Sequence, residues 1–132
     1  MDEALRRVLD LEPDLLYALV FGSLARGTHR SDSDVDIAVE FRPGATQDAR
    51  AIGRLAARLE SATRRPVDLV LLDEAPAPLA YRVFDHGRLL IERDHAALVA
   101  RKARVIVEYL DWKPIEERCA RGVLRAAAAR GR

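Results

Sequence analysis

Residues 19–41 read LVFGSLARGTHRSDSDVDIAVEF, and this stretch decides the fold expected of the chain. The apolar run Leu19–Phe21 predicts the end of a strand, with Gly22 as the turn and Ser23 as the N-cap of a short helix. A helix N-terminus exposes unpaired backbone N–H groups, and a glycine lets the backbone approach a ligand closely. We therefore expect Gly22 and Ser23 to bind a phosphate.

The segment after this turn alternates as a strand does. Residues 34–41 read DVDIAVEF, and a period of two places Asp34 and Asp36 on one face. The opposite, buried face receives the apolar side chains Val35, Ile37, Val39 and Phe41. Two carboxylates whose Cα atoms lie about 6–7 Å apart repel each other unless a cation lies between them. Carboxylate oxygens are ligands of Mg²⁺, so the pair predicts a magnesium site.

A third acid interrupts a later apolar strand. Residues 65–72 read RPVDLVLL, and burying Asp68 without a partner would be costly, so we expect it where the strand meets water or a metal. Two ions held by three carboxylates can activate a hydroxyl and stabilise a leaving pyrophosphate. Asp34, Asp36 and Asp68 are therefore the candidate catalytic and metal-binding residues. Asp34 and Asp36 would bridge the ions and the nucleotide phosphates. Asp68 would help hold the ion beside the attacking oxygen and could accept the proton of that oxygen.

The two motifs together resemble a known signature. Gly22-Ser23-Leu24-Ala25-Arg26-Gly27 followed by Ser33-Asp34-Val35-Asp36 is similar to the motif of the minimal nucleotidyltransferases of the DNA polymerase β superfamily. Length and the later segments 73–76, 87–94 and 108–115 are further similar to the MntA-like antitoxins of the HEPN/MNT type. The motif covers about a tenth of the chain closely, and the order of elements fits the group throughout.

The resemblance implies an antitoxin that is an ATP- and magnesium-dependent protein adenylyltransferase. It would transfer AMP to a tyrosine of a HEPN ribonuclease toxin and so silence it. The implied site comprises Gly22 and Ser23 for the nucleotide, and Asp34, Asp36 and Asp68 for two magnesium ions. Whether Arg26 reaches a phosphate is left open. The choice of ATP rests on the resemblance alone.

Composition agrees with a small enzyme rather than a nucleic-acid-binding polycation. The chain has 132 residues, enough for a single domain 1–132, and a formal net charge of +1. Residues 101–132 carry nine Lys/Arg against four Asp/Glu, so the C-terminal end is basic and the remainder acidic. This asymmetry favours a partner-docking role for a helical tail at about residues 95–132, with no direct nucleic-acid binding.

The chain has one cysteine, Cys119, and no apolar run near the roughly 20 residues of a membrane span. The absence of a secretory signal core adds to the expectation of a cytoplasmic protein without membrane insertion.

The hydrophobic pattern predicts an α/β (α+β) fold with a small mixed sheet packed with helices. Strands are expected at residues 15–21, 35–41, 65–72 and 88–92. Helices are expected at residues 2–11, 46–63, 77–85 and 96–110. Pro114 is expected to begin a separate final helix to about residue 129, because the first turn of a helix tolerates proline.

Several alternatives remain at this point. Asp34 and Asp36 could form the solvated face of an edge strand, and Asp68 could pair with Arg64 or Arg65. The chain could instead modify a small molecule such as an aminoglycoside, or block a toxin by contact without catalysis. The acceptor residue, the number of AMP groups, the base preference and the stoichiometry of a complex are not determined by the sequence.

Overall fold

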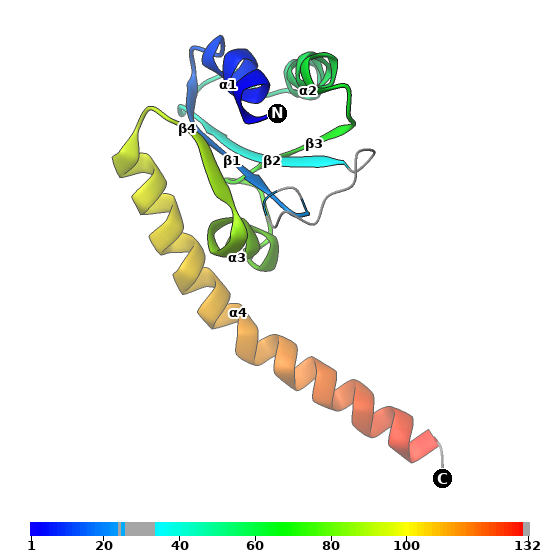
Figure 1. Cartoon of the computed structure of the whole chain (residues 1–132). Coiled ribbons are helices and arrows are strands. Elements are labelled where there is room, and N and C mark those ends of the chain that lie inside the picture. Colours follow the sequence, from blue (N-terminus) through cyan, green and yellow to red (C-terminus); the bar gives the residue numbers. More distant parts are fainter. Residues whose placement is uncertain (24, 26–33, 131–132) are drawn as a thin grey trace.

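One mixed sheet of four strands forms the centre of the computed structural model, which describes residues 1–23, 25 and 34–130. The strands lie in the order β3-β2-β1-β4, and their bounds are Leu15–Phe21 for β1, Val35–Phe41 for β2, Val67–Leu71 for β3 and Arg88–Glu92 for β4. β1 pairs antiparallel with β2 and with β4, whereas β2 and β3 are parallel (Figure 1). The predicted mixed sheet is thus confirmed. β2 is an interior strand.

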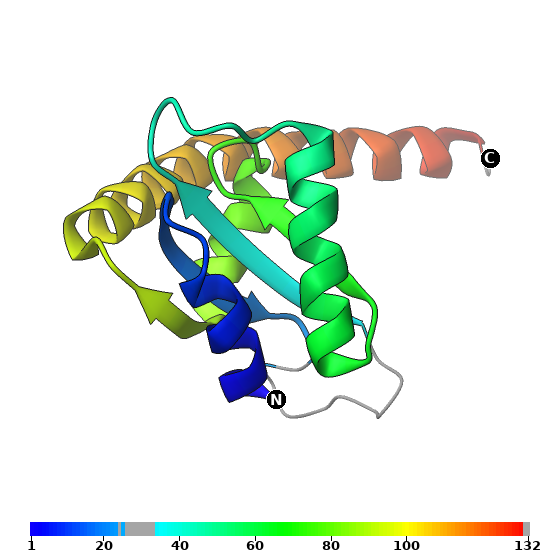
Figure 2. The same cartoon turned by 90° about the horizontal axis from the view of Figure 1, so that it is seen from above.

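Helices cover both faces of the sheet. Their bounds are Asp2–Asp10 for α1, Ala49–Thr63 for α2, Ala77–His86 for α3 and His95–Arg130 for α4. α1 and α2 contact each other over one face, while α3 and the first part of α4 contact each other and β1 on the other face (Figures 1 and 2). The result is a three-layer arrangement with the sheet in the middle.

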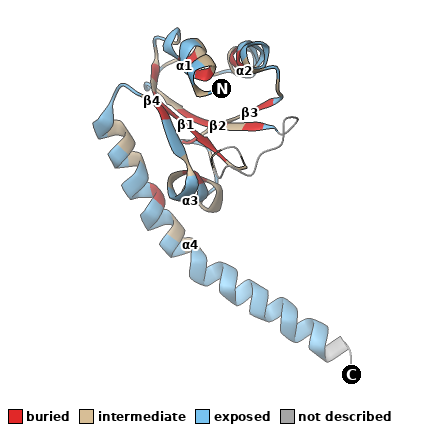
Figure 3. Cartoon of the chain, viewed as in Figure 1, coloured by how far each residue is buried: buried red, intermediate tan, exposed pale blue. Residues whose placement is uncertain are grey.

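The core lies in two clusters, one on each face of the sheet. Strand alternation sends one set of β2 side chains toward Leu5 of α1 and Leu59 of α2. On the other face, Tyr17 of β1 packs with Val83 of α3 and Val105 of α4. Because helices cover both faces, β1 is buried along nearly its whole length (Figure 3). This fixes the register of the strands that carry the acidic residues.

The prediction of two separate C-terminal helices is wrong. α4 runs continuously from His95 to Arg130 with Pro114 inside it. A proline lacks an N–H, so the carbonyl of Leu110 loses its intrahelical partner. Leu110 is 60% exposed, and water can satisfy that carbonyl. Good helix formers on both sides of Pro114 favour continuation of the helix.

The outer half of α4 projects away from the body of the molecule (Figures 1 and 2). A stack of aromatic rings marks where the two part. Tyr81 of α3 stacks on Tyr109 with ring centroids 4.0 Å apart, and Tyr109 in turn lies 5.9 Å from Trp112. Beyond this stack the helix is exposed (Figure 3).

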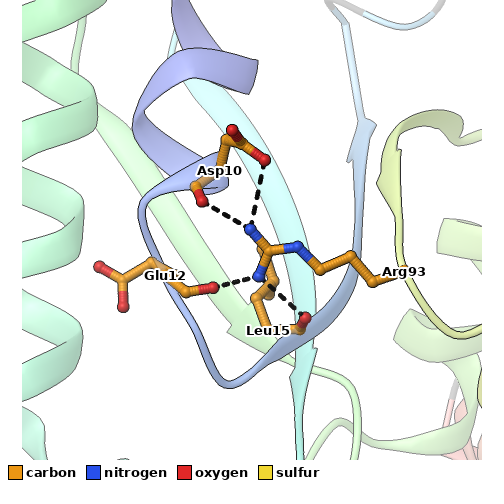
Figure 4. A network of polar contacts seen from close by, with 4 residues as sticks. All are labelled: Asp10, Glu12, Leu15 and Arg93. Atoms are coloured by element: carbon orange, nitrogen blue, oxygen red, sulfur yellow. Dashed lines mark hydrogen bonds and ion pairs between the residues drawn. The ribbon is translucent and has the colours of Figure 1, made fainter.

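Arg93, between β4 and α4, is bonded to the loop that connects α1 and β1. Its guanidinium donates to the backbone carbonyls of Asp10, at 2.6 Å, of Glu12, and of Leu15, at 3.4 Å (Figure 4). It also pairs with the Asp10 carboxylate at 3.3 Å. The loop between α1 and β1 is thereby tied to the segment that leads into α4.

The other predicted elements are confirmed with small shifts at their ends. α2 begins at Ala49 rather than near residue 46, because the carboxylate of Asp48 accepts the N–H of Ala51 at 2.8 Å and caps the helix. The short helix expected from residue 24, and Arg26 with it, lie outside the described residues. No helix in the described part of the chain combines the length and apolar character that a membrane span needs.

Candidate active site

The turn at the end of β1 brings backbone and carboxylate into contact. Gly22 has a φ of 72°, a left-handed conformation that favours glycine. A Cβ atom at this position would lie 2.3 Å from Oδ2 of Asp36, so a side chain here would force the Asp36 carboxylate to move and would also be strained by the backbone conformation. Ser23 follows in the same turn and is partly buried. The predicted position of Gly22 and Ser23 at a turn after a strand is confirmed, whereas phosphate binding there stays a prediction.

Two of the three predicted acids lie opposite each other on neighbouring strands. Asp36 pairs with Asp68 in the parallel register of β2 and β3, and with Phe21 of β1 on its other side. Asp34 directly precedes β2 and is exposed, as is Asp68, whereas Asp36 is partly buried. The sheet therefore brings together acids that are 32 residues or more apart in the sequence.

The two structural alternatives for these acids can now be compared with the strand order. β2 lies between β1 and β3, so Asp36 is not on an edge strand. Asp68 forms no ion pair with Arg64 or Arg65, all three residues being among those described. The structure therefore shows neither an edge-strand position for Asp36 nor an ion pair of Asp68 with these arginines.

The charges at the site act on one another. Burial raises the pKa of Asp36 above its ordinary value, and the negative charges of Asp68 and then Asp34 raise it further. Such mutual repulsion is relieved when a cation or a proton binds between the carboxylates. Carboxylates that raise one another's pKa, rather than pair with cations, are typical of a binding site.

A pocket of about 380 Å³ opens beside these residues, and its wall comprises Phe21, Gly22, Asp36, Asp68, Leu69, Val70, Leu79 and Arg82. The strands contribute the acids, and α3 contributes Leu79 and Arg82. Sequence reasoning missed both residues of α3. The sequence offers one signal for them, the helical spacing of α3. Leu79 and Arg82 are three residues apart and therefore lie on one face of the helix, next to the face that Ala80 and Val83 bury.

A larger hollow of about 750 Å³ lies at the other end of the sheet, between the start of β1 and the end of β2. Its wall includes Asp14, Glu40 and Arg42, but Asp14 already pairs with Arg42. No acids face each other there from adjacent strands in the described residues. Size alone therefore does not identify the site. The smaller pocket is the better candidate because two carboxylates from adjacent strands line it.

The donor set fits a hard divalent cation such as Mg²⁺, because three carboxylates supply only oxygen ligands. Asp36 and Asp68 are adjacent, and the negative charges of Asp68 and Asp34 add to the larger effect of burial in raising the pKa of Asp36. Within the described residues, however, no three acidic, histidine or cysteine side chains are grouped so that they could hold a metal ion as they stand. The exposed side chains of Asp34 and Asp68 would have to turn toward an ion.

The family model for polymerase beta, nucleotidyltransferase, matches residues 3–96, which include every strand and all five predicted site residues. The chain belongs to this family. A relative, the protein adenylyltransferase MntA of Shewanella oneidensis, is 36% identical over 89 residues. That match covers 67% of this chain but 63% of the relative, less than two thirds of its length.

Solved structures match over more than nine tenths of the chain, so the similarity extends into α4. A toxin-antitoxin complex with AMP-PNP matches with a TM-score of 0.79 and 30% identity, covering 93% of this chain and 98% of that chain. The complex of a tri-AMPylated HEPN toxin with an MNT antitoxin from Shewanella oneidensis matches with a TM-score of 0.73 and 26% identity. That match covers 94% of this chain and 99% of the other.

Proposed function

We propose that this chain is an antitoxin that transfers AMP from ATP to a tyrosine hydroxyl of a HEPN ribonuclease toxin and thereby neutralises it. The observation that carries the proposal is the pairing of Asp36 with Asp68 on adjacent parallel strands, with Gly22 pressed against Asp36. The protein adenylyltransferase MntA and the complex with an AMPylated HEPN toxin, both similar to this chain, support the choice of reaction and partner.

The proposed reaction is an in-line displacement at the α-phosphorus of ATP. A bond forms between the acceptor oxygen and this phosphorus as the bond to the bridging oxygen of the β-phosphate breaks, and pyrophosphate leaves. Two Mg²⁺ ions, when bound, would stabilise the charge that develops on the phosphates. Asp34 and Asp36 would hold both ions, and Asp68 would help hold the ion beside the attacking oxygen and accept the proton of the acceptor hydroxyl. The turn at Gly22 and Ser23 would hold the phosphates.

We also propose that the chain is a single domain, 1–132, in which residues 95–132 include the surface that docks the toxin. The outer half of α4 is exposed and carries large apolar side chains, among them Ile115, Val123 and Leu124 at 59%, 70% and 69% exposure. A lone helix of this kind gains its stability largely by packing an apolar face against something else. We further propose a cytoplasmic location, which agrees with the proposed use of ATP.

Labelling of the co-purifying partner tests the reaction. The full chain with its bound partner is incubated with Mg²⁺ and ATP labelled at the α-phosphate, and label on the partner is measured. Asp34→Asn and Asp36→Asn are each expected to reduce labelling by at least about a hundredfold, because metal-held charge supplies several kcal/mol.

The matched control is Asp85→Asn, which removes an exposed carboxylate of α3 that pairs with His86 and does not line the pocket. It should label the partner as the parent does. Full labelling by both site variants would refute the metal-centred reaction. If the parent fails to label the partner and yet all forms neutralise it, the chain acts by contact alone.

A further inference from the structure

Arg82 of α3 lines the same pocket as the paired acids, from the helix layer that covers this face of the sheet. α3 packs on the sheet through Ala80 and Val83, which are 2% and 0% exposed. Leu79 and Arg82, three residues apart and so neighbours on the helix surface, line the pocket together. Asp36 and Asp68 line the pocket from the sheet. Arg82, an exposed residue, thus lines the same pocket as the two carboxylates.

The charge of Arg82 is not used within the described part of the protein. Arg42, Arg88 and Arg101 each pair with a carboxylate. Arg82 forms no ion pair or hydrogen bond with any described residue, even though two acids line the same pocket. Among the described residues of the pocket wall it is the only cation. An arginine is always charged in a protein, so this positive charge is available to a ligand.

A nucleoside triphosphate presents two different demands to this site. The α-phosphorus must lie at the carboxylates and their ions, while the rest of the phosphate chain carries negative charge that the same carboxylates repel. A guanidinium on the facing wall meets the second demand, because its planar fork matches phosphate oxygens in two parallel hydrogen bonds.

We infer that Arg82 binds the β- and γ-phosphates of the nucleotide and the pyrophosphate that leaves. As the bond from the α-phosphorus to the bridging oxygen breaks, that oxygen keeps the electron pair and the pyrophosphate gains negative charge. Arg82 stabilises this charge at the pocket wall. The inference rests on the proposed function, since it assigns a role within the same nucleotide site.

Binding measurements separate this role from that of a solvated surface arginine. Titration calorimetry is done on the full chain with Mg²⁺ and either AMP or the α,β-methylene analogue of ATP, for the parent and for Arg82→Gln and Arg82→Lys. Arg82→Gln is expected to weaken binding of the analogue by about tenfold to a hundredfold, as loss of a charge-assisted hydrogen bond does. Binding of AMP should be unchanged. Arg82→Lys should lie between, because lysine keeps the charge without the fork.

Arg54→Gln is the matched control, because Arg54 is an exposed arginine of α2, on the other face of the sheet. It should bind both ligands as the parent does. Equal affinity of Arg82→Gln and the parent for the analogue would overturn the inference, and so would an equal loss for AMP and the analogue. If the parent binds neither ligand, the proposed function fails and takes the inference with it.

Discussion

At the scale of single residues, the site depends on a glycine that has two separate reasons to be there. Gly22 has a positive φ and also leaves room for the Asp36 carboxylate. Gly44 has a φ of 84° but open space around the position of a Cβ. The two glycines therefore separate conformational strain from steric conflict within one chain.

Gly22→Ala and Gly44→Ala are each expected to lower the free energy of unfolding by about 1 kcal/mol or more, because alanine is strained at positive φ. Only Gly22→Ala should also displace the Asp36 carboxylate and abolish AMP transfer. Urea unfolding gives the first quantity, and partner labelling gives the second. Full activity of Gly22→Ala would show that the contact with Asp36 is not needed.

Asp36 makes the stability of the metal-free protein depend on pH. Because its pKa is raised in the folded state, the folded protein binds this proton more tightly than the unfolded chain does. The stabilisation is present below the ordinary carboxyl pKa of 3.8 and is lost as pH rises through the folded-state value. Asp36→Asn removes this loss.

We therefore expect Asp36→Asn to unfold at a higher temperature than the parent at pH 7 without divalent ions, and the difference to shrink toward pH 4. Thermal unfolding over this pH range measures it. Added Mg²⁺ should stabilise the parent and leave the variant less affected. A variant that is less stable than the parent at pH 7 would contradict the assignment, because ionised Asp36 would then not destabilise the metal-free protein.

At the scale of elements, α4 is anchored to the sheet by a largely buried polar cluster. Glu40 of β2 accepts hydrogen bonds from the Tyr17 hydroxyl at 3.0 Å and from Nε of Arg101 at 2.6 Å. The side chains of Arg101 and Glu40 are 18% and 12% exposed. Burial, and then the negative charge of Glu40, raise the pKa of Tyr17 far above its usual range, so the hydroxyl stays protonated and donates.

Glu40→Ala is expected to lower the free energy of unfolding by about 3 kcal/mol, because it leaves a largely buried cation without its partner. Asp14→Ala breaks the exposed pair of Asp14 with Arg42, whose side chains are 39% and 61% exposed, and should cost less than about 1 kcal/mol. Urea unfolding compares the two. Equal small losses would mean that water already screens the Glu40 cluster.

The sequence predicted these elements unevenly, for physical reasons. Period-two alternation and glycine turns placed β1 and β2 correctly, and with them Asp34 and Asp36, because these signals lie within a few neighbouring residues. The facing of Asp36 and Asp68 depends on strand order, which no local pattern contains. Arg82 was missed for the same reason. The error at Pro114 arose because a proline acts against a helix locally, whereas solvent exposure of the freed carbonyl decides whether the helix continues.

At the scale of the whole molecule, the chain consists of a packed body, to which we assign catalysis, and an exposed helix, to which we assign docking of the partner. The body comprises the sheet, α1 to α3 and the start of α4, and it holds every acid of the site. The basic excess and the exposed apolar side chains of α4 lie at the C-terminal end. Catalysis and recognition of the acceptor are therefore open to separate tests.

The double variant Val123→Glu/Leu124→Glu is expected to raise the KM for the partner by about tenfold or more, as loss of apolar interface residues does. Both positions are exposed, so the melting temperature and ATP binding should not change. Steady-state labelling at varied partner concentration measures the KM. Leu11→Glu, at a position 70% exposed at the end of α1, is the control. An unchanged KM would place docking elsewhere.

The aromatic stack of Tyr81, Tyr109 and Trp112 lies between α3 and α4, and beyond it the helix continues, exposed, toward Arg130. At 1.5 Å per residue, residues 113–130 extend about 27 Å beyond the stack. An acceptor that contacts the C-terminal end of α4 while its hydroxyl enters the pocket must itself be as large as a protein. If the partner docks on α4 as proposed, the length of the helix therefore sets a minimum size for that partner.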